Sequence, residues 1–208
     1  EYRAKGIGND LWLLRRNTLL KRLQPNAAIG MDGVVAMQPF YQKGGFTIAY
    51  RDERYEKKGE RFPLNPKVQI AAAKDKAALF ALDLECFGVA RTQFLKLWLN
   101  PSKAKTFTYI ENDTLLGFAV MRECQIGYKI GPLFAENETA AEALYERCLS
   151  EALEEPVYLD IPLNNEAAVR LVEKYKANYV FECARMYYGI PPKTAKAKVF
   201  GITSFELG

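Results

Sequence analysis

The sequence contains no histidine, and this absence removes several kinds of chemistry at once. Serine–histidine and cysteine–histidine nucleophilic mechanisms both need an imidazole base, so neither is available to this chain. The four cysteines, Cys86, Cys124, Cys148 and Cys183, are widely spaced and form no C-x-x-C pair. Without histidines or paired cysteines, we expect no metal site. We interpret the cysteines as buried free thiols in a reducing cytosol, and we therefore expect a cytoplasmic protein.

Long apolar runs are also missing. None approaches the roughly 20 residues that a membrane span needs, so we expect no membrane partner. The net charge is only +4 over 208 residues, and basic and acidic side chains are intermixed. Scattered charge of this kind is typical of a solvated surface rather than of a nucleic-acid-binding face, so we expect no nucleic-acid partner. The length suits one large or two modest domains.

Helical and extended patterns alternate along the chain, which predicts a mixed α/β fold. The apolar spacing that follows Ile7 predicts a helix that ends before Pro25, and a strand that turns at Asp32-Gly33 comes next. Further helices are expected at 38–43, 74–87, 90–99, 138–153 and 164–175. Further strands are expected at 46–55, 68–73, 105–113, 114–124, 128–135, 157–162, 179–189 and 198–208.

Two stretches of the chain share one order of elements. In the first, a helix is followed by a strand that ends in Asp32, a short helix and a strand. In the second, a helix is followed by a strand that ends in Asp160, a helix and a strand. We interpret this as a faint internal repeat, with chance similarity of two α/β stretches as the alternative. Residues 59–66 between them are charged, contain two prolines and lack periodicity, which predicts a linker between domains 1–58 and 67–208.

The glycines near the start of the chain have the spacing of a phosphate-binding loop. Backbone that surrounds a phosphate needs residues without a Cβ, and a helix that begins at once adds its free N–H groups. Gly6 and Gly8 before the first helix meet this requirement. A P-loop is excluded because Asn9-Asp10 follows Gly8, and a dinucleotide fingerprint is excluded because Leu11 replaces its third small residue. A glycine-rich helix start that binds nothing remains the alternative.

The remaining pattern, Arg3-x-x-Gly6-x-Gly8, resembles the acyl-CoA pyrophosphate loop of the GNAT superfamily of N-acyltransferases. Residues 39–46, PFYQKGGF, resemble the short helix and the Gly-Phe strand start that follow this loop in the family. The resemblance implies acetyl-CoA as cosubstrate. It also implies that the cofactor is held by Arg3, Ala4, Lys5, Gly6, Ile7, Gly8, Asn9 and Tyr41. Tyr41 matches the family's tyrosine near the CoA sulfur, which implies a general acid for the leaving thiolate.

Residues 67–208 resemble the second, complete domain of bacterial tandem-GNAT proteins, on stretches such as RTQFLKLWL and YLDIPLNNEAAVRLVEK. Residues 1–58 resemble only the C-terminal half of such a domain. We therefore expect an upstream segment, or another chain, to supply the rest of the first domain. Aligning the helices of the two copies places Glu138 and Ala140 where Gly6 and Gly8 stand. A carboxylate there would repel pyrophosphate, so we expect no CoA site in the second domain.

The resemblance implies an enzyme that transfers an acetyl group from acetyl-CoA to a primary amine. The amine belongs either to a small molecule or to a protein or peptide, and an oligomer is compatible with this interpretation. The general base is left open between a carboxylate, an ordered water and a residue of the missing half. The alternative function is a non-catalytic module that binds or senses acyl-CoA or serves as a scaffold. Measurable turnover would separate the two.

Overall fold

The structure is a computed structural model that describes residues 5–25, 27–100 and 102–207. Arg3 and Ala4, two of the predicted cofactor-binding residues, lie outside the described residues. The helices are α1 (Ile7–Leu20), α2 (Gln38–Lys43), α3 (Lys76–Phe87), α4 (Thr92–Trp98), α5 (Glu138–Glu151) and α6 (Glu166–Lys174). The strands are β1 (Ile29–Val34), β2 (Thr47–Lys58), β3 (Val68–Ile70), β4 (Lys105–Glu111), β5 (Thr114–Glu123), β6 (Tyr128–Ala135), β7 (Pro156–Pro162), β8 (Asn178–Tyr188) and β9 (Val199–Gly201). These elements confirm the predicted mixed α/β class.

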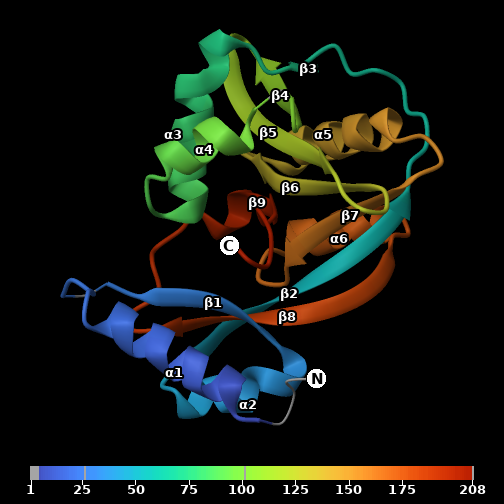
Figure 1. Cartoon of the computed structure of the whole chain (residues 1–208). Helices are drawn as coiled ribbons and strands as arrows, with labels where there is room; N and C mark the ends of the chain where they lie inside the picture. Colours follow the sequence, from blue (N-terminus) through green and yellow to red (C-terminus); the bar gives the residue numbers. More distant parts are fainter. Residues whose placement is uncertain (1–4, 26, 101, 208) are drawn as a thin grey trace.

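The strands of the described part of the chain form one 9-stranded sheet. Its order is β1-β8-β2-β7-β6-β5-β4-β3, and β9 pairs with β6 outside this path. Strand β8, from near the end of the chain, lies between β1 and β2, from its beginning (Figure 1). The predicted domains 1–58 and 67–208 therefore share one sheet, and their strands are interleaved in it.

The faint internal repeat is visible in the order and size of the elements. α1-β1-α2-β2 and α5-β7-α6-β8 follow the same sequence of helix and strand, and α1 and α5 each have 14 residues. Strand β8 pairs with β1 of the first copy, and β2 pairs with β7 of the second. Each copy thus receives a strand from the other, and the β2–β8 pair joins them.

Helices cover both faces of the sheet. The largest core lies against α5 and α6, and α3 and α4 cover the opposite face of the same strands (Figure 1). Three alanines on the buried side of α5, Ala140, Ala141 and Ala143, let this helix approach β5 and β6 closely. At the other end of the sheet, α1 and α2 pack through Trp12 and Tyr41 on a small cluster around Met186.

Local signals fix several element ends as the sequence predicts. Gly88, with a φ of 87°, ends α3, because an L side chain rarely adopts that backbone conformation. Asn112 and Asp113 have φ of 48° and 58° and form the predicted hairpin turn between β4 and β5. The predicted closing strand at 198–208 is much shorter, because the chain leaves the sheet after Gly201 and packs Phe205 against Phe181.

Candidate functional site

The first predicted site residues lie at an open helix start. Gly6 has a left-handed φ of 77°, and α1 begins at the next residue, with no side chain capping its first turn. Gly8 therefore lies inside the first helical turn rather than in the loop before it. Residues 5–10 are exposed, and a Cβ built at Gly6 or Gly8 would meet no atom of the described residues within 4 Å. The N–H groups of Ile7, Gly8 and Asn9 have no partner within the helix, so they can receive an anion.

The matching helix start in the second copy is already satisfied. α5 begins at Glu138, and the side chain of Asn137 accepts a hydrogen bond of 2.9 Å from the Ala140 N–H. Gly6, which precedes α1, therefore corresponds to Asn137. The predicted alignment of Glu138 with Gly6 and of Ala140 with Gly8 was wrong by one residue, because the cap that sets the start of α5 cannot be read from periodicity. Asn137 uses the donor that an anion would need.

Strand β9 fills a gap between two other strands of the second copy. β6 and β7 pair only from Tyr128 to Ile130 and then diverge. Beyond that point, β9 pairs with β6 at Leu133, and the Ile202 N–H donates to the Asp160 carbonyl of β7 over 2.9 Å. The C-terminal segment thus satisfies backbone groups of both diverging strands and leaves no room between them for a ligand.

The corresponding edge of the first copy is open among the described residues. β1 stands at the end of the sheet order, and no described strand pairs with its outer edge. α1 beside it has no buried residue. Large apolar side chains are exposed on α1, at the last residue of β1 and just after it: Ile7, Leu11, Leu13, Leu14, Leu19, Val34, Val35 and Met37. An apolar helix and an unpaired strand edge form a surface that is suited to being covered.

Tyr41 lies on the α1 and α2 side of β1. Its ring packs on Gly33, where a Cβ would lie only 3.1 Å from the ring, and its centroid is 6.1 Å from that of Trp12. Gly33 thus lets the tyrosine approach the backbone of β1 closely. The structure brings Tyr41 onto β1 on the same side of the sheet as the α1 helix.

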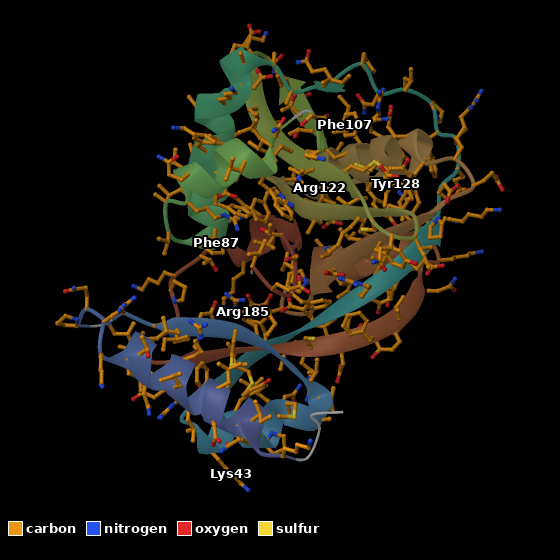
Figure 2. All side chains as sticks on the ribbon, viewed as in Figure 1. Lys43, Phe87, Phe107, Arg122, Tyr128 and Arg185 are labelled. Carbon is orange, nitrogen blue, oxygen red and sulfur yellow. The ribbon has the colours of Figure 1, made fainter. Side chains whose placement is uncertain are left out.

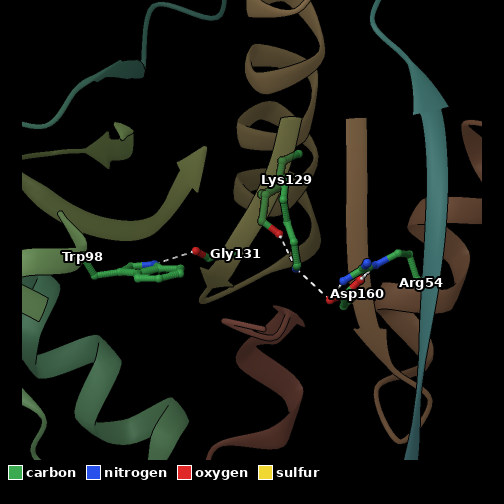
Figure 3. A network of polar contacts seen from close by, with 6 residues as sticks. Arg54, Trp98, Lys129, Gly131 and Asp160 are labelled. Carbon is green, nitrogen blue, oxygen red and sulfur yellow. Dashed lines mark hydrogen bonds and ion pairs between the residues drawn. The ribbon is translucent and has the colours of Figure 1, made fainter. Parts of the chain in front are cut away.

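The opposite side of the same strands carries charge instead. Asp32 on β1 forms an ion pair of 2.7 Å with Arg185 on β8. In the second copy, Asp160 on β7 pairs with Arg54 on β2 at 2.6 Å and with Lys129 on β6 at 2.8 Å (Figure 3). Burial opposes the charge on Asp160, but Lys129 and Arg54 outweigh it and hold the pKa of this carboxyl below its usual value. Asp32 has only one cation, and burial raises its pKa to about 6.

Asp52 forms no ion pair within the described part of the chain. It lies between Tyr50 and Arg54 on the same side of β2, and it is 1% exposed with neither carboxylate oxygen hydrogen-bonded to the described residues. Burial, and secondly the charge of Asp32, raise its pKa to about 8. The sequence interpretation missed this residue, since RDERY reads as an exposed polar strand. The available signal was the repeat, which aligns Arg54 with Arg185 and leaves Asp52 unmatched by an acid.

A cavity of about 540 Å³ opens beside this charged face. Its lining includes Asp32, Tyr50, Arg185 and Tyr187 from the strands, with Phe87 on the far side. Figure 2 shows Arg185 rising from the lower strands toward the part of the molecule that carries Phe87. Apolar side chains complete the wall, and they include Val89, Ile190, Pro192 and Ile202. The cavity therefore has an ion pair, Asp32 with Arg185, on its strand side and an apolar and aromatic rim, and Lys196 and Glu206 also line it.

The structure bears on three predictions from the sequence: no metal site, no membrane span and four buried free thiols. No group of residues within the described part could hold a metal ion. Among the helices that the structure describes, none has the length and apolar character needed to cross a membrane. The four cysteines are free, and Cys86, Cys148 and Cys183 are buried as predicted. Cys124 is exposed, which corrects the prediction, because it follows the end of β5 in the turn to β6.

Comparison with known proteins identifies the family. Holothin acyltransferase of Pseudoalteromonas sp. (strain SANK 73390) is 27% identical over 208 residues, which cover 99% of this chain and 69% of that protein. A crystal structure from Pyrococcus horikoshii, assigned as an acetyltransferase, matches with a TM-score of 0.82 at 24% identity, over 100% of this chain and 68% of that one. A GCN5-related N-acetyltransferase from Sphaerobacter thermophilus matches with a TM-score of 0.64 at 13% identity, over 93% and 72%.

A family model described as an acetyltransferase (GNAT) domain matches residues 79–201, more than half of the chain. The matched residues include β4 to β8 and begin after the glycine loop. The chain therefore belongs to the GNAT acetyltransferase family, and it is an acyltransferase that uses an acyl-CoA donor.

Proposed function

We propose that this protein transfers an acetyl group from acetyl-CoA to a primary amine, and that the cofactor binds at the start of α1. The open helix start carries the proposal. Gly6 turns the chain into α1, and among the described residues no side chain caps the first turn and no atom lies within 4 Å of a Cβ built at Gly8. A helix start of this kind attracts a pyrophosphate through both its free donors and its dipole. Arg3, Ala4 and Lys5 precede it, and the two cations add attraction for the same oxygens.

We assign Tyr41 the role of general acid. Expulsion of a thiolate is easier when a proton reaches the sulfur as the bond breaks, and a tyrosine hydroxyl can supply it. Tyr41 lies on the same side of the sheet as α1 and contacts β1 at Gly33. A phosphate anchor on α1 and a donor beside β1 would bind the two ends of one extended cofactor.

We also propose that only the first of the two copies binds the cofactor. We divide the chain at the linker 59–66 into the C-terminal half of a first GNAT domain and a degenerate second domain. Two observations support a single cofactor site. Asn137 already caps α5, and β9 fills the gap between β6 and β7. The free edge of β1 and the exposed apolar side chains of α1 support the idea that further strands, from this protein or another chain, complete the first domain.

A non-catalytic acyl-CoA sensor is the second candidate, and the same loop would serve it. The buried acidic residues beside the cavity favour an enzyme, since a sensor has no use for a proton acceptor. Turnover of acetyl-CoA with a primary amine would distinguish the two functions.

Calorimetric titration of acetyl-CoA into the protein tests the loop. In Gly8→Glu, a negative side chain replaces open space at the second helical residue, and we expect affinity to fall by at least about 30-fold, the equivalent of about 2 kcal/mol. The matched control is Thr139→Glu, at the second residue of α5, which should leave affinity unchanged. Unchanged binding in Gly8→Glu, or an equal loss in both variants, would overturn the loop assignment.

A further inference from the structure

Charge is unevenly distributed along the inner face of the sheet. At the second copy, one carboxylate, Asp160, is surrounded by two cations, Arg54 and Lys129. At the first copy, two carboxyl groups, Asp32 and Asp52, share the single cation Arg185. If all three side chains of the first-copy cluster were charged, two carboxylates would face one guanidinium and the cluster would lack one positive charge. A proton held by one of the two carboxyl groups makes up this deficit, and a bound cation could replace it.

The register of the strands places these groups around Arg185. Asp32 and Tyr50 lie directly opposite Arg185 on the two strands that flank β8, and Asp52 is two residues further along β2. Only one oxygen of Asp32 is used by Arg185. Its other oxygen, Oδ1, is buried without a hydrogen-bond partner among the described residues, on a side chain that lines the cavity. A ligand with an N–H⁺ group is the natural partner for such an oxygen.

On the basis of the proposed function, we propose that the cavity is the acceptor site and that it takes a small primary amine as its ammonium ion on an apolar body. Asp32 binds the ammonium group through Oδ1 and accepts its proton. Asp52 is a positioning residue, which supplies the balancing negative charge by releasing its own proton when the cation binds. The apolar body lies against the rim formed by Phe87, Val89 and Ile190.

The protons balance over one turnover. The ammonium gives one proton to the Asp32 carboxylate, and the neutral nitrogen then forms its bond to the thioester carbon. As the carbon–sulfur bond breaks, the nitrogen loses its second proton to solvent, and the thiolate gains a proton from Tyr41, the general acid of the proposed function. Tyr41 and Asp52 recover their protons from solvent once the neutral amide leaves, and Asp32 returns its proton to solvent. The net products are the amide, the free thiol and one proton.

The pH dependence of this site is set by groups on three strands and on the C-terminal segment. The groups that face Asp32 and Asp52 are Arg185, Tyr187 and Cys183 on β8, Tyr50 and Arg54 on β2, Asp160 on β7 and Glu206 in the C-terminal segment. Burial raises the pKa of Tyr50, so this hydroxyl stays neutral near pH 7. Asp32, with a pKa of about 6, is ionised at that pH, and Asp52, with a pKa of about 8, is mainly protonated. This is the arrangement that the proposal needs.

The test uses 2-phenylethylamine as the probe and 2-phenylethanol as its neutral counterpart of similar size. Calorimetry at pH 7, in buffers with different ionisation enthalpies, measures both affinity and protons released. We expect the amine to bind at least 10-fold more tightly than the alcohol and to release nearly one proton. Asp32→Asn should weaken amine binding at least 10-fold. Asp52→Asn should still bind the amine but release almost no proton, a readout that a purely structural role would not change.

Glu182→Gln is the matched control, because it removes one carboxylate from the opposite face of β8, where Glu182 pairs with Arg51. It should behave as the wild type, and circular dichroism should show that all three variants are folded. No amine binding, equal binding of the alcohol, or an unaltered proton count in Asp52→Asn would overturn the proposal. Because acetyl-CoA is absent from this titration, its outcome is independent of the loop test on Gly8.

Discussion

Asp32 and Arg185 lie directly opposite each other on β1 and β8 and form an ion pair of 2.7 Å. Asp160 and Arg54 repeat this relationship on β7 and β2, with a bidentate contact of 2.6 and 2.9 Å. The two pairs mark the same place in the two copies of the repeat. Only the first pair borders the large cavity and has a second, uncompensated carboxyl group, Asp52, beside it. The two copies of the repeat thus have a similar strand arrangement but a different balance of charge, and this difference distinguishes their roles.

Asp52→Asn should stabilise the protein, and the gain should grow with pH. The unfolded chain gives up the Asp52 proton near pH 4, whereas the folded chain keeps it until about pH 8. Below pH 4, both states are protonated and the wild type loses nothing. Between these values, the raised pKa costs the wild type stability that a neutral amide does not lose. We expect a gain of more than about 1 kcal/mol at pH 8, or roughly 2–4 °C in Tm, from thermal melts between pH 4 and 8. A constant difference across that range would contradict the buried, unpaired carboxyl.

Asp160→Asn should have the opposite effect. It leaves Arg54 and Lys129 without their shared carboxylate, and breaking a buried pair on one side costs about 3–5 kcal/mol. Because the folded pKa of Asp160 is lowered, its contribution is present above the unfolded pKa and is lost as the pH falls through the folded pKa. Urea unfolding at pH 7 should show the full loss, and the gap between variant and wild type should narrow in acid. A variant as stable as the wild type at pH 7 would mean that the ion pairs of Asp160 with Arg54 and Lys129 do not stabilise the fold.

Much of the local structure could be predicted from the sequence, because its causes are local. Leucine spacing marks α1, Gly88 ends α3, and Asn112-Asp113 makes the hairpin turn. The insertion of β8 between β1 and β2 could not be predicted, since it depends on pairing between residues far apart in the chain, such as Thr47 and Tyr187, which are 140 positions apart. Periodicity does not report such pairing.

The residues of the candidate site also differ in whether the sequence alone reveals them. Gly6 and Tyr41 belong to short motifs whose spacing is visible in the sequence, whereas Asp52 becomes unusual only once the folded chain buries it. Phe205 and Ile202 pack over Cys183 on the strand that neighbours Asp52, and this burial comes from residues about 150 positions away. The sequence around a carboxylate in a polar strand does not show that the folded chain will bury it.

Tyr41→Phe should lower turnover while acetyl-CoA still binds normally. The ring keeps its packing on Gly33 and Trp12, and only the hydroxyl is lost. General acid catalysis contributes about 10²–10⁴-fold, so we expect kcat to fall by that factor. Steady-state kinetics with any accepted amine, paired with calorimetry for acetyl-CoA, separates the two effects. Wild-type turnover in this variant would make Tyr41 a packing residue.

Asn137→Ala should weaken the protein without creating a second cofactor site. Loss of the N-cap to Ala140 costs about 1 kcal/mol, and denaturant unfolding would measure it. β9 still fills the gap between β6 and β7, so uncapping α5 leaves no room for the rest of the cofactor. Binding of a second acetyl-CoA by the variant would show that the Asn137 cap alone prevents cofactor binding in the second copy.

The cofactor site is tested most directly by an NMR titration of the ¹⁵N-labelled protein with acetyl-CoA. The central claim is that one chain binds one cofactor, at the start of α1. We expect saturation at one equivalent, with large amide shifts for Ile7, Gly8 and Asn9 and none for Thr139 and Ala140. Saturation at two equivalents, or shifts centred on the start of α5, would contradict it.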